Sequence, residues 1–124
     1  MIIKESAENY LESILMLKSK NGFVRSIDIA NDLSVSKPSV SVAMKNFREE
    51  GYITVDTDGY IDLTEKGLDI AKRVYERHEI IASALEALGV SRQTALDDSC
   101  KIEHVISEES FLKIKEFLNS KNNK

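Results

Sequence analysis

The spacing of apolar residues changes from a helical to a strand period once in this chain, and this change constrains the fold most. Helical spacing is found in three segments, at residues 7–19, 27–33 and 36–50. Two short β-prone runs follow, at residues 52–55 and 60–63. Asp58 and Gly59 lie between these runs, where an Asp-Gly pair is a strong signal for a hairpin. Helices followed by a hairpin in this order predict a winged helix-turn-helix.

Small polar residues stand at the expected helix starts, where a side-chain oxygen can accept a hydrogen bond from a backbone N–H of the first turn. The expected N-caps are Ser6, Ser26, Ser36, Thr64, Ser91 and Ser107. Pro38 suits the first turn of the third helix because its missing N–H needs no partner there. After the hairpin, the pattern predicts helices at residues 65–88, 92–106 and 108–118. We expect the polar tail that follows, residues 119–124, to fray.

The fold class that follows is mainly α, with a winged helix-turn-helix over residues 1–64 and an all-helical domain over residues 65–124. The chain has 124 residues, of which 42% are hydrophobic and 31% are charged, a composition typical of a folded protein. It contains no apolar run of the roughly 20 residues that span a membrane, and its first residues lack a signal-peptide core. A single cysteine excludes an internal disulfide. We therefore expect a cytoplasmic protein.

The charge distribution favours DNA binding by the third helix, although the formal net charge of the chain is -4. Residues 23–48 carry four basic and two acidic side chains, whereas residues 49–67 carry one basic and six acidic ones. In a helix-turn-helix, the N-terminal residues of the recognition helix meet base edges in the major groove. The candidate DNA-binding residues are Ser36, Lys37, Pro38, Ser39, Ser41, Val42 and Lys45. The alternative is a solvated helix face, and the acidic hairpin tip is expected to contribute little.

Residues 100–104 carry the most specific local pattern, Cys-Lys-Ile-Glu-His. On a helix, Cys100, Glu103 and His104 share one face, and a thiolate, a carboxylate and an imidazole are good ligands for a divalent transition metal. The alternative is a buried cysteine beside a surface Glu-His pair, which is the commoner situation for such a pattern on its own. The only other histidine, His78, lies on a helix that we expect to pack against this one.

Over essentially its whole length, the chain resembles the diphtheria-toxin-repressor and manganese-transport-regulator family of metal-dependent repressors. The resemblance rests on four stretches: SAENYLESILML, SIDIANDLSVSKPSVSVAMKNFREEGYI, LTEKGLDIAKRVYERHEII and DDSCKIEHVIS. It implies a homodimer that binds Fe(II) or Mn(II) and then its operator in double-stranded DNA, and so controls metal-homeostasis genes.

The resemblance also implies a ligand set. The positions that match the family's ligands are Glu12, His78, Cys100, Glu103 and His104. Asn9 falls where relatives have Asp or Met, so its amide oxygen would be a weaker, neutral ligand. Cys100 is what the iron-responsive branch has, whereas the manganese branch has a carboxylate there. Because a thiolate is borderline soft, Fe(II) is the expected metal and Mn(II) the second choice.

Two further features of the family are expected to be reduced in this chain. Ala82 and Leu96 occupy positions where the iron branch has a carboxylate and a histidine, so the second metal site of that branch is eroded. The chain stops near residue 124, which implies that the SH3-like domain of longer relatives is absent.

The helices after Thr64 carry more apolar residues than a small monomer needs to cover, which favours a dimer interface there. This apolar set is Ile80, Ile81, Ala84, Leu85 and Leu88. The alternative is that these residues fill the core of the monomer. For the function, the alternative is a winged-helix regulator that responds to a non-metal ligand. An enzyme that uses Cys100 as nucleophile and His104 as base is disfavoured because no third orienting group is recognisable.

Overall fold

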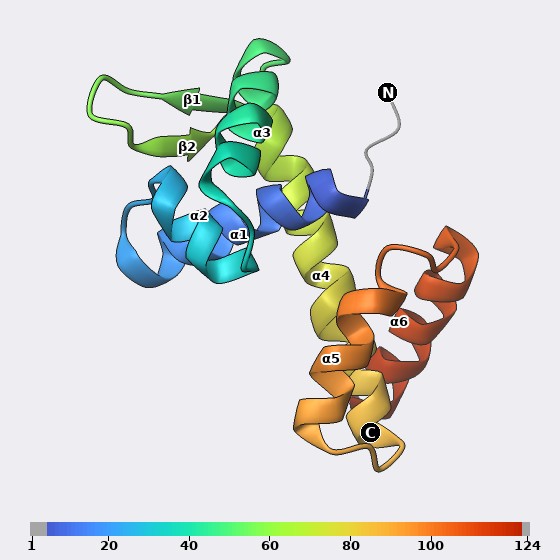
Figure 1. Ribbon diagram of the computed structural model, residues 1–124. Helices are drawn as coiled ribbons and strands as arrows, with labels where there is room; N and C mark the ends of the chain where they lie inside the picture. The colour runs from blue at the N-terminus through green and yellow to red at the C-terminus, as the bar shows by residue number, and fades with distance from the viewer. Residues whose placement is uncertain (1–4, 123–124) are drawn as a thin grey trace. The chain divides into compact units, whose positions relative to one another are not determined.

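The computed structural model describes residues 5–122, which form six helices and one two-stranded sheet (Figure 1). The helices are α1 (Glu5–Asn21), α2 (Ser26–Leu33), α3 (Lys37–Glu49), α4 (Glu65–Ala87), α5 (Arg92–Ile102) and α6 (Glu108–Asn122). The strands are β1 (Ile53–Val55) and β2 (Ile61–Leu63). By their contacts these elements fall into two compact units, one reaching Lys72 and the other starting at Arg73. The mainly helical fold class and the order of elements are confirmed, and the domain boundary at residue 64 stays a prediction.

The helix-turn-helix is formed by α2, a tight turn and α3. Ser34, the C-cap of α2, adopts a left-handed backbone conformation with φ of 55°, which turns the chain towards α3. Ser36 caps α3 as predicted, because its Oγ accepts a hydrogen bond from the Ser39 backbone N–H at 3.3 Å. The prediction of Ser26 as N-cap is wrong. Arg25 is the N-cap of α2, and its backbone N–H donates to the Asp28 carboxylate at 2.9 Å.

The hairpin forms where the Asp-Gly signal predicts it. Strands β1 and β2 pair antiparallel, with Ile53 opposite Leu63 and Val55 opposite Ile61. The turn is stabilised by Asp56, whose Oδ1 accepts hydrogen bonds from the backbone N–H groups of Asp58 and Tyr60, each at 2.9 Å. Asp56 is therefore engaged with its own turn, a local side-chain-to-backbone arrangement for which Asp is well suited.

The core of the N-terminal unit is built from the predicted apolar stripes. Buried side chains come from α1, α2, α3 and both strands, and the largest that are fully buried are Leu11, Ile14, Val24, Ile29, Val40 and Ile53. Gly67, in the first turn of α4, packs so closely that an added Cβ would lie 2.1 Å from the Tyr52 carbonyl oxygen. The start of α4 is thereby seated directly on the chain that enters β1.

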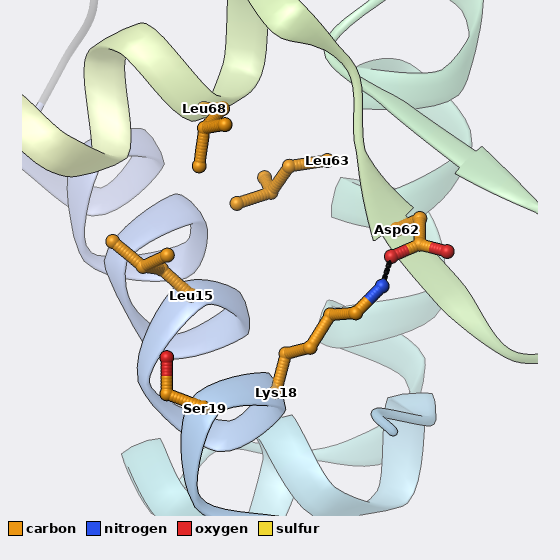
Figure 2. A pocket seen from close by; sticks show the side chains of 6 residues that line it. All are labelled: Leu15, Lys18, Ser19, Asp62, Leu63 and Leu68. Carbon is orange, nitrogen blue, oxygen red and sulfur yellow. Dashed lines mark ion pairs between the residues drawn. The ribbon is translucent and has the colours of Figure 1, made fainter. Parts of the chain in front are cut away.

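A small hollow of about 300 Å³ lies in the N-terminal unit between α1, β2 and the start of α4 (Figure 2). Leu15, Leu63 and Leu68 line it, and an ion pair between Lys18 and Asp62 lies beside them. Both charged side chains are about half exposed, at 46% and 56%, so the pair adds at most about 1 kcal/mol of stability. It does link the end of α1 to the hairpin.

The C-terminal unit has a core of its own, made by the later part of α4 with α5 and α6. Its buried apolar residues are Val74, Ile81, Ala82, Ala95, Phe111 and Leu118. Two predicted helix ends are wrong here: α5 stops at Ile102 instead of residue 106, and α6 continues through the expected frayed tail to Asn122. Residues 123–124 of that tail lie outside the described part of the chain. None of the helices described is long and apolar enough to cross a membrane.

Candidate metal centre and DNA-recognition surface

The candidate DNA-binding residues all lie on the exposed side of α3 and its N-cap. Every one of the seven is exposed, from Ser36 to Lys45, and the Val42 side chain is 61% exposed although it is apolar. The opposite side of α3 is buried through Val40, Met44 and Phe47. This division presents short hydroxyl side chains, one valine and two lysines to solvent. Their contacts with DNA stay a prediction.

The Ser36 hydroxyl is already engaged in the helix cap, because it also donates to the Ser39 Oγ at 2.8 Å. Ser36 therefore holds the start of α3 in place. Ser39 and Ser41 follow in the first two turns, where a short side chain allows a helix to approach a partner closely. The expectation of weak wing contacts likewise stays a prediction, and Asp56 and Asp58 at the wing tip are exposed.

The C-terminal unit brings four of the six candidate metal ligands together. His78 comes from α4, Cys100 from α5, and Glu103 and His104 from the turn after α5. His78 Nδ1 lies 3.0 Å from Glu103 Oε2 and 3.8 Å from Cys100 Sγ. On the other side of the carboxylate, His104 Nε2 lies 3.3 Å from Glu103 Oε1. Two imidazoles therefore flank one carboxylate, with a thiol beside one of them.

The prediction that Cys100, Glu103 and His104 share one helix is wrong, because α5 ends at Ile102. Their convergence survives because Glu103 keeps helical backbone angles as the C-cap, with φ of -58° and ψ of -25°. Its N–H also still donates to the Ser99 carbonyl at 3.0 Å. His104 lies in the turn that follows, so the spacing that predicts a common helix face still places the side chains on one side.

The alternative interpretation of residues 100–104 requires a buried cysteine beside an exposed Glu-His pair, and the structure shows the reverse. Cys100 is exposed, whereas the side chains of Glu103 and His104 are each only 1% exposed. Within the described chain, Glu103 Oε1 is buried and accepts no hydrogen bond, although His104 Nε2 lies 3.3 Å from it. A buried carboxylate oxygen without a donor is unfavourable by about 1–3 kcal/mol or more, so the site has capacity for one further positive partner.

These residues fit a divalent transition metal by the chemistry of their atoms. Imidazole nitrogen, carboxylate oxygen and thiolate sulfur are the three protein donors that such ions accept most often. The contacts in the structure are pairwise, and among residues 5–122 no three His, Cys, Asp or Glu side chains form a ready-made metal site. The assignment of the ligands therefore stays a prediction that the buried, donor-free oxygen of Glu103 supports.

Asn9 and Glu12 belong to the other unit, where they lie three residues apart on α1, and both are half-buried. Their part in a metal site stays a prediction. Ala82 is fully buried and Leu96 is half-buried, and neither hydrocarbon side chain carries a metal-binding atom, so the erosion of the second site stays a prediction.

Ser99 is a residue of this region that sequence reasoning missed. It is fully buried, and its Oγ donates to the His78 backbone carbonyl at 2.6 Å, which joins α5 to α4 beside the candidate ligands. The available signal is a serine on the side of the helix that also carries the buried Ala95, where an apolar residue is expected.

An apolar hollow of about 430 Å³ lies elsewhere in the C-terminal unit, between α4 and α6. Its lining includes Ile81, Ala84, Leu85 and Leu88, four of the five residues predicted to form a dimer interface. Leu88 is 78% exposed, and Phe117, which also lines the hollow, is 61% exposed. Ile81 is buried, so the apolar set is shared between the unit's own core and its exposed surface.

Comparison with known proteins matches two family models to the chain. Residues 3–66 match the model described as the iron dependent repressor, N-terminal DNA binding domain. Residues 64–123 match the model described as the iron dependent repressor, metal binding and dimerisation domain. The two models together extend over nearly the whole sequence.

Relatives of similar length are transcriptional regulators. An uncharacterized HTH-type transcriptional regulator of Methanocaldococcus jannaschii is 33% identical over 118 residues, which is 94% of each chain. The HTH-type transcriptional regulator MntR of Bacillus subtilis is 34% identical over 109 residues, which is 88% of this chain and 77% of the relative.

Solved structures have the same fold. The manganese regulator SloR superimposes with a TM-score of 0.77 at 27% identity, and T. acidophilum IdeR superimposes with a TM-score of 0.81 at 22% identity. Both alignments cover 96% of this chain, which spans 55% of the length of each of those two chains. With both family models and these relatives in agreement, the chain belongs to the iron-dependent repressor family, a family of metal-dependent transcriptional regulators and not of enzymes.

Proposed function

We propose that this protein is a cytoplasmic homodimeric repressor that binds its operator when a divalent metal, Fe(II) in preference to Mn(II), is bound. The observation that carries the proposal is the buried Glu103 carboxylate, with one oxygen that has no hydrogen-bond donor among the described residues, between His78 and His104. The genes under its control would be those of metal homeostasis, as the family resemblance implies.

The residues that would hold the metal in the C-terminal unit are His78, Cys100, Glu103 and His104. The family resemblance adds Glu12 and Asn9 of α1 to this set. A bound cation would supply positive charge to the buried carboxylate and to the thiolate. The thiolate of Cys100 is the reason to prefer Fe(II), since softer ligands favour it over Mn(II).

The DNA contacts of the proposed repressor are made by the exposed side of α3. Ser39 and Ser41 would bond phosphates or base edges, Val42 would contact thymine methyl groups, and Lys45 would contact a phosphate or guanine. Lys37 and Pro38 form the first turn, which Ser36 caps. Two copies of α3 in a dimer would read two half-sites about one helical turn of DNA apart.

Dimerisation is proposed to use the apolar surface of the C-terminal unit. Leu88 and Phe117 are exposed beside the hollow that Ile81, Ala84 and Leu85 line. A metal that binds only the DNA-competent arrangement shifts the population towards it by its differential affinity for the two arrangements. The proposal therefore requires that metal affinity and DNA affinity rise together.

The first experiment measures DNA binding by fluorescence anisotropy under anaerobic conditions, with Fe(II), Mn(II), Zn(II) or a chelator in parallel. The DNA is a duplex selected from a random library in the presence of Mn(II). We expect tight binding with Fe(II) or Mn(II) and a loss of at least tenfold in affinity with chelator. Equal affinity in all four conditions would contradict the proposal and favour a regulator that responds to a non-metal ligand.

The second experiment removes the thiol. Cys100→Ala is expected to abolish metal-dependent operator binding without loss of folding, because Cys100 is exposed and contributes little to the core. Lys101→Ala, an exposed neighbour on the same helix, is the matched control and should behave as the unmodified protein. If Cys100→Ala still requires Fe(II) for operator binding, Cys100 is not a ligand.

A further inference from the structure

Arg77 makes an unusual set of contacts with the turn between α5 and α6. Its guanidinium donates hydrogen bonds to the backbone carbonyls of Glu103, at 3.3 Å, and Ile106, at 3.2 Å. It also pairs with the Glu108 carboxylate and lies over the Phe111 ring, with 5.2 Å to the ring centroid. One side chain of α4, only 17% exposed, thus holds both ends of this turn.

The Glu103 carbonyl lies at the C-cap of α5, where the last carbonyls of a helix have no hydrogen-bond donors within the helix, and the Ile106 carbonyl lies in the turn outside either helix. The chain leaves α5 at Ile102, and residues 103–107 connect it to α6. A cation near a helix C-terminus also interacts favourably with the helix dipole. Arginine is suited to this role because its planar fork carries five N–H donors, whereas lysine has a single nitrogen that cannot reach several acceptors in fixed directions.

The same turn carries two of the proposed metal ligands. Glu103, whose carbonyl accepts from Arg77, also presents its carboxylate to His78, the residue that follows Arg77 in α4. Two consecutive residues of α4 therefore hold Glu103. Arg77 contacts its backbone carbonyl, and His78 contacts its side-chain carboxylate. A displacement of the turn would move Glu103 and His104 together relative to His78.

We infer that Arg77 is a positioning residue for the metal centre, one that fixes the turn bearing Glu103 and His104 against His78. The inference rests on the proposed function, since it assigns a residue outside the ligand set to the same site. Groups that orient metal ligands without touching the ion commonly change metal affinity 10- to 100-fold when they are replaced. Arg77 orients these ligands through the backbone of the turn, by its hydrogen bonds to the Glu103 and Ile106 carbonyls.

The test compares Arg77→Met with Arg92→Met. Arg92 is a matched control because it lies in the same unit and pairs with Glu86, yet it is 56% exposed and does not contact the turn in any described interaction. The Mn(II) dissociation constant is measured by isothermal titration calorimetry on the full chain. Urea unfolding of the metal-free protein shows how much of each variant is folded.

We expect Arg77→Met to raise the Mn(II) dissociation constant 10- to 100-fold and Arg92→Met to change it less than twofold. The absorption spectrum of bound Co(II) is the second readout, because it reports the number and geometry of the ligands. Arg77→Met should alter this spectrum at metal saturation. A purely structural role would lower the free energy of unfolding but leave the spectrum of the folded, saturated protein unchanged.

Arg77→Lys is the variant to test if Arg77→Met does not fold. It keeps the charge beside Glu108 but loses the paired carbonyl contacts, so we expect a smaller rise in the dissociation constant and an altered Co(II) spectrum. The inference is overturned if a folded variant binds Mn(II) within threefold of the unmodified protein with an unchanged spectrum, or if neither variant folds. Failure of the unmodified protein to bind Mn(II) or Co(II) would instead overturn the proposed function.

Discussion

Replacement of Glu103 by glutamine should raise the stability of the metal-free protein and reduce the stabilisation that a bound metal provides. The Glu103 side chain is 1% exposed, and one of its oxygens has no hydrogen-bond donor among residues 5–122. Glutamine has nearly the same shape but removes the buried charge. Its amide oxygen can still accept a hydrogen bond from His78 Nδ1, and its amide NH₂ group can donate towards His104.

The expected difference in free energy of unfolding between Glu103→Gln and the unmodified protein changes sign between the metal-free and the Mn(II)-bound state. A buried polar oxygen without a donor is unfavourable by about 1–3 kcal/mol, so relief of that penalty raises the free energy of unfolding of metal-free Glu103→Gln by about this amount. Mn(II) at about a thousand times its dissociation constant stabilises the unmodified protein by about 4.1 kcal/mol. The variant loses a charged ligand, so we expect the metal to stabilise it by less than about 1 kcal/mol. The order of stability of the two proteins therefore reverses when metal is added.

The assay is urea unfolding followed by circular dichroism at pH 8, with chelator or with Mn(II). Glu109→Gln is the matched control, because Glu109 is exposed in the same unit and the same chemical change there should leave the metal response intact. Metal-free Glu103→Gln that is less stable than the unmodified protein by more than about 1 kcal/mol would refute the argument from the buried oxygen. Equal stabilisation of Glu103→Gln and the unmodified protein by Mn(II) would refute Glu103 as a ligand.

Three further predictions follow from the packing and the exposed surfaces. Gly67→Ala should destabilise the protein by about 1–3 kcal/mol in urea unfolding, because the new Cβ would lie 2.1 Å from the Tyr52 carbonyl oxygen; unchanged or increased stability, as helix propensity alone predicts, would contradict this. Lys45→Ala should weaken operator binding and lower the salt dependence of log K by about one unit if Lys45 contacts a phosphate, whereas the exposed Lys121→Ala should do neither. Phe117→Glu should convert the dimer to a monomer in sedimentation at micromolar concentration, because it places a charge beside the apolar hollow; a dimer that survives would place the interface elsewhere.

The helix-turn-helix and its hairpin could be predicted because their signals are local. The buried stripe of α3, with Val40, Met44 and Phe47, follows directly from helical spacing, and Ser36 caps that helix as its position indicates. The hairpin turn forms at the Asp-Gly pair, where Gly59 has φ of 86°, a backbone conformation that few residues other than glycine accept. These features depend on contacts between residues a few positions apart.

The sequence predicts that Cys100, Glu103 and His104 converge, but on a single helix face, which is not how the structure brings them together. The pattern at residues 100–104 predicts one helix face, whereas α5 ends at Ile102 and Glu103 is its C-cap. The prediction of Ser26 as a cap is also wrong, because Arg25 is the N-cap and its backbone N–H donates to the Asp28 carboxylate. Helix ends of this kind depend on which hydrogen bonds compete for the last backbone groups.

The order of the elements, the buried stripe of α3 and the side chains with metal-binding atoms follow from local patterns in the chain. The exposure of Cys100, the burial of Glu103 and His104, and the contact of Arg77 with their turn follow from the packing of α4 against α5 and α6. The difference lies in the separation of the interacting residues along the chain. Capping and periodicity act within one or two turns, whereas the bond from Arg77 to Glu103 joins residues 26 positions apart and exists only once the helices have packed.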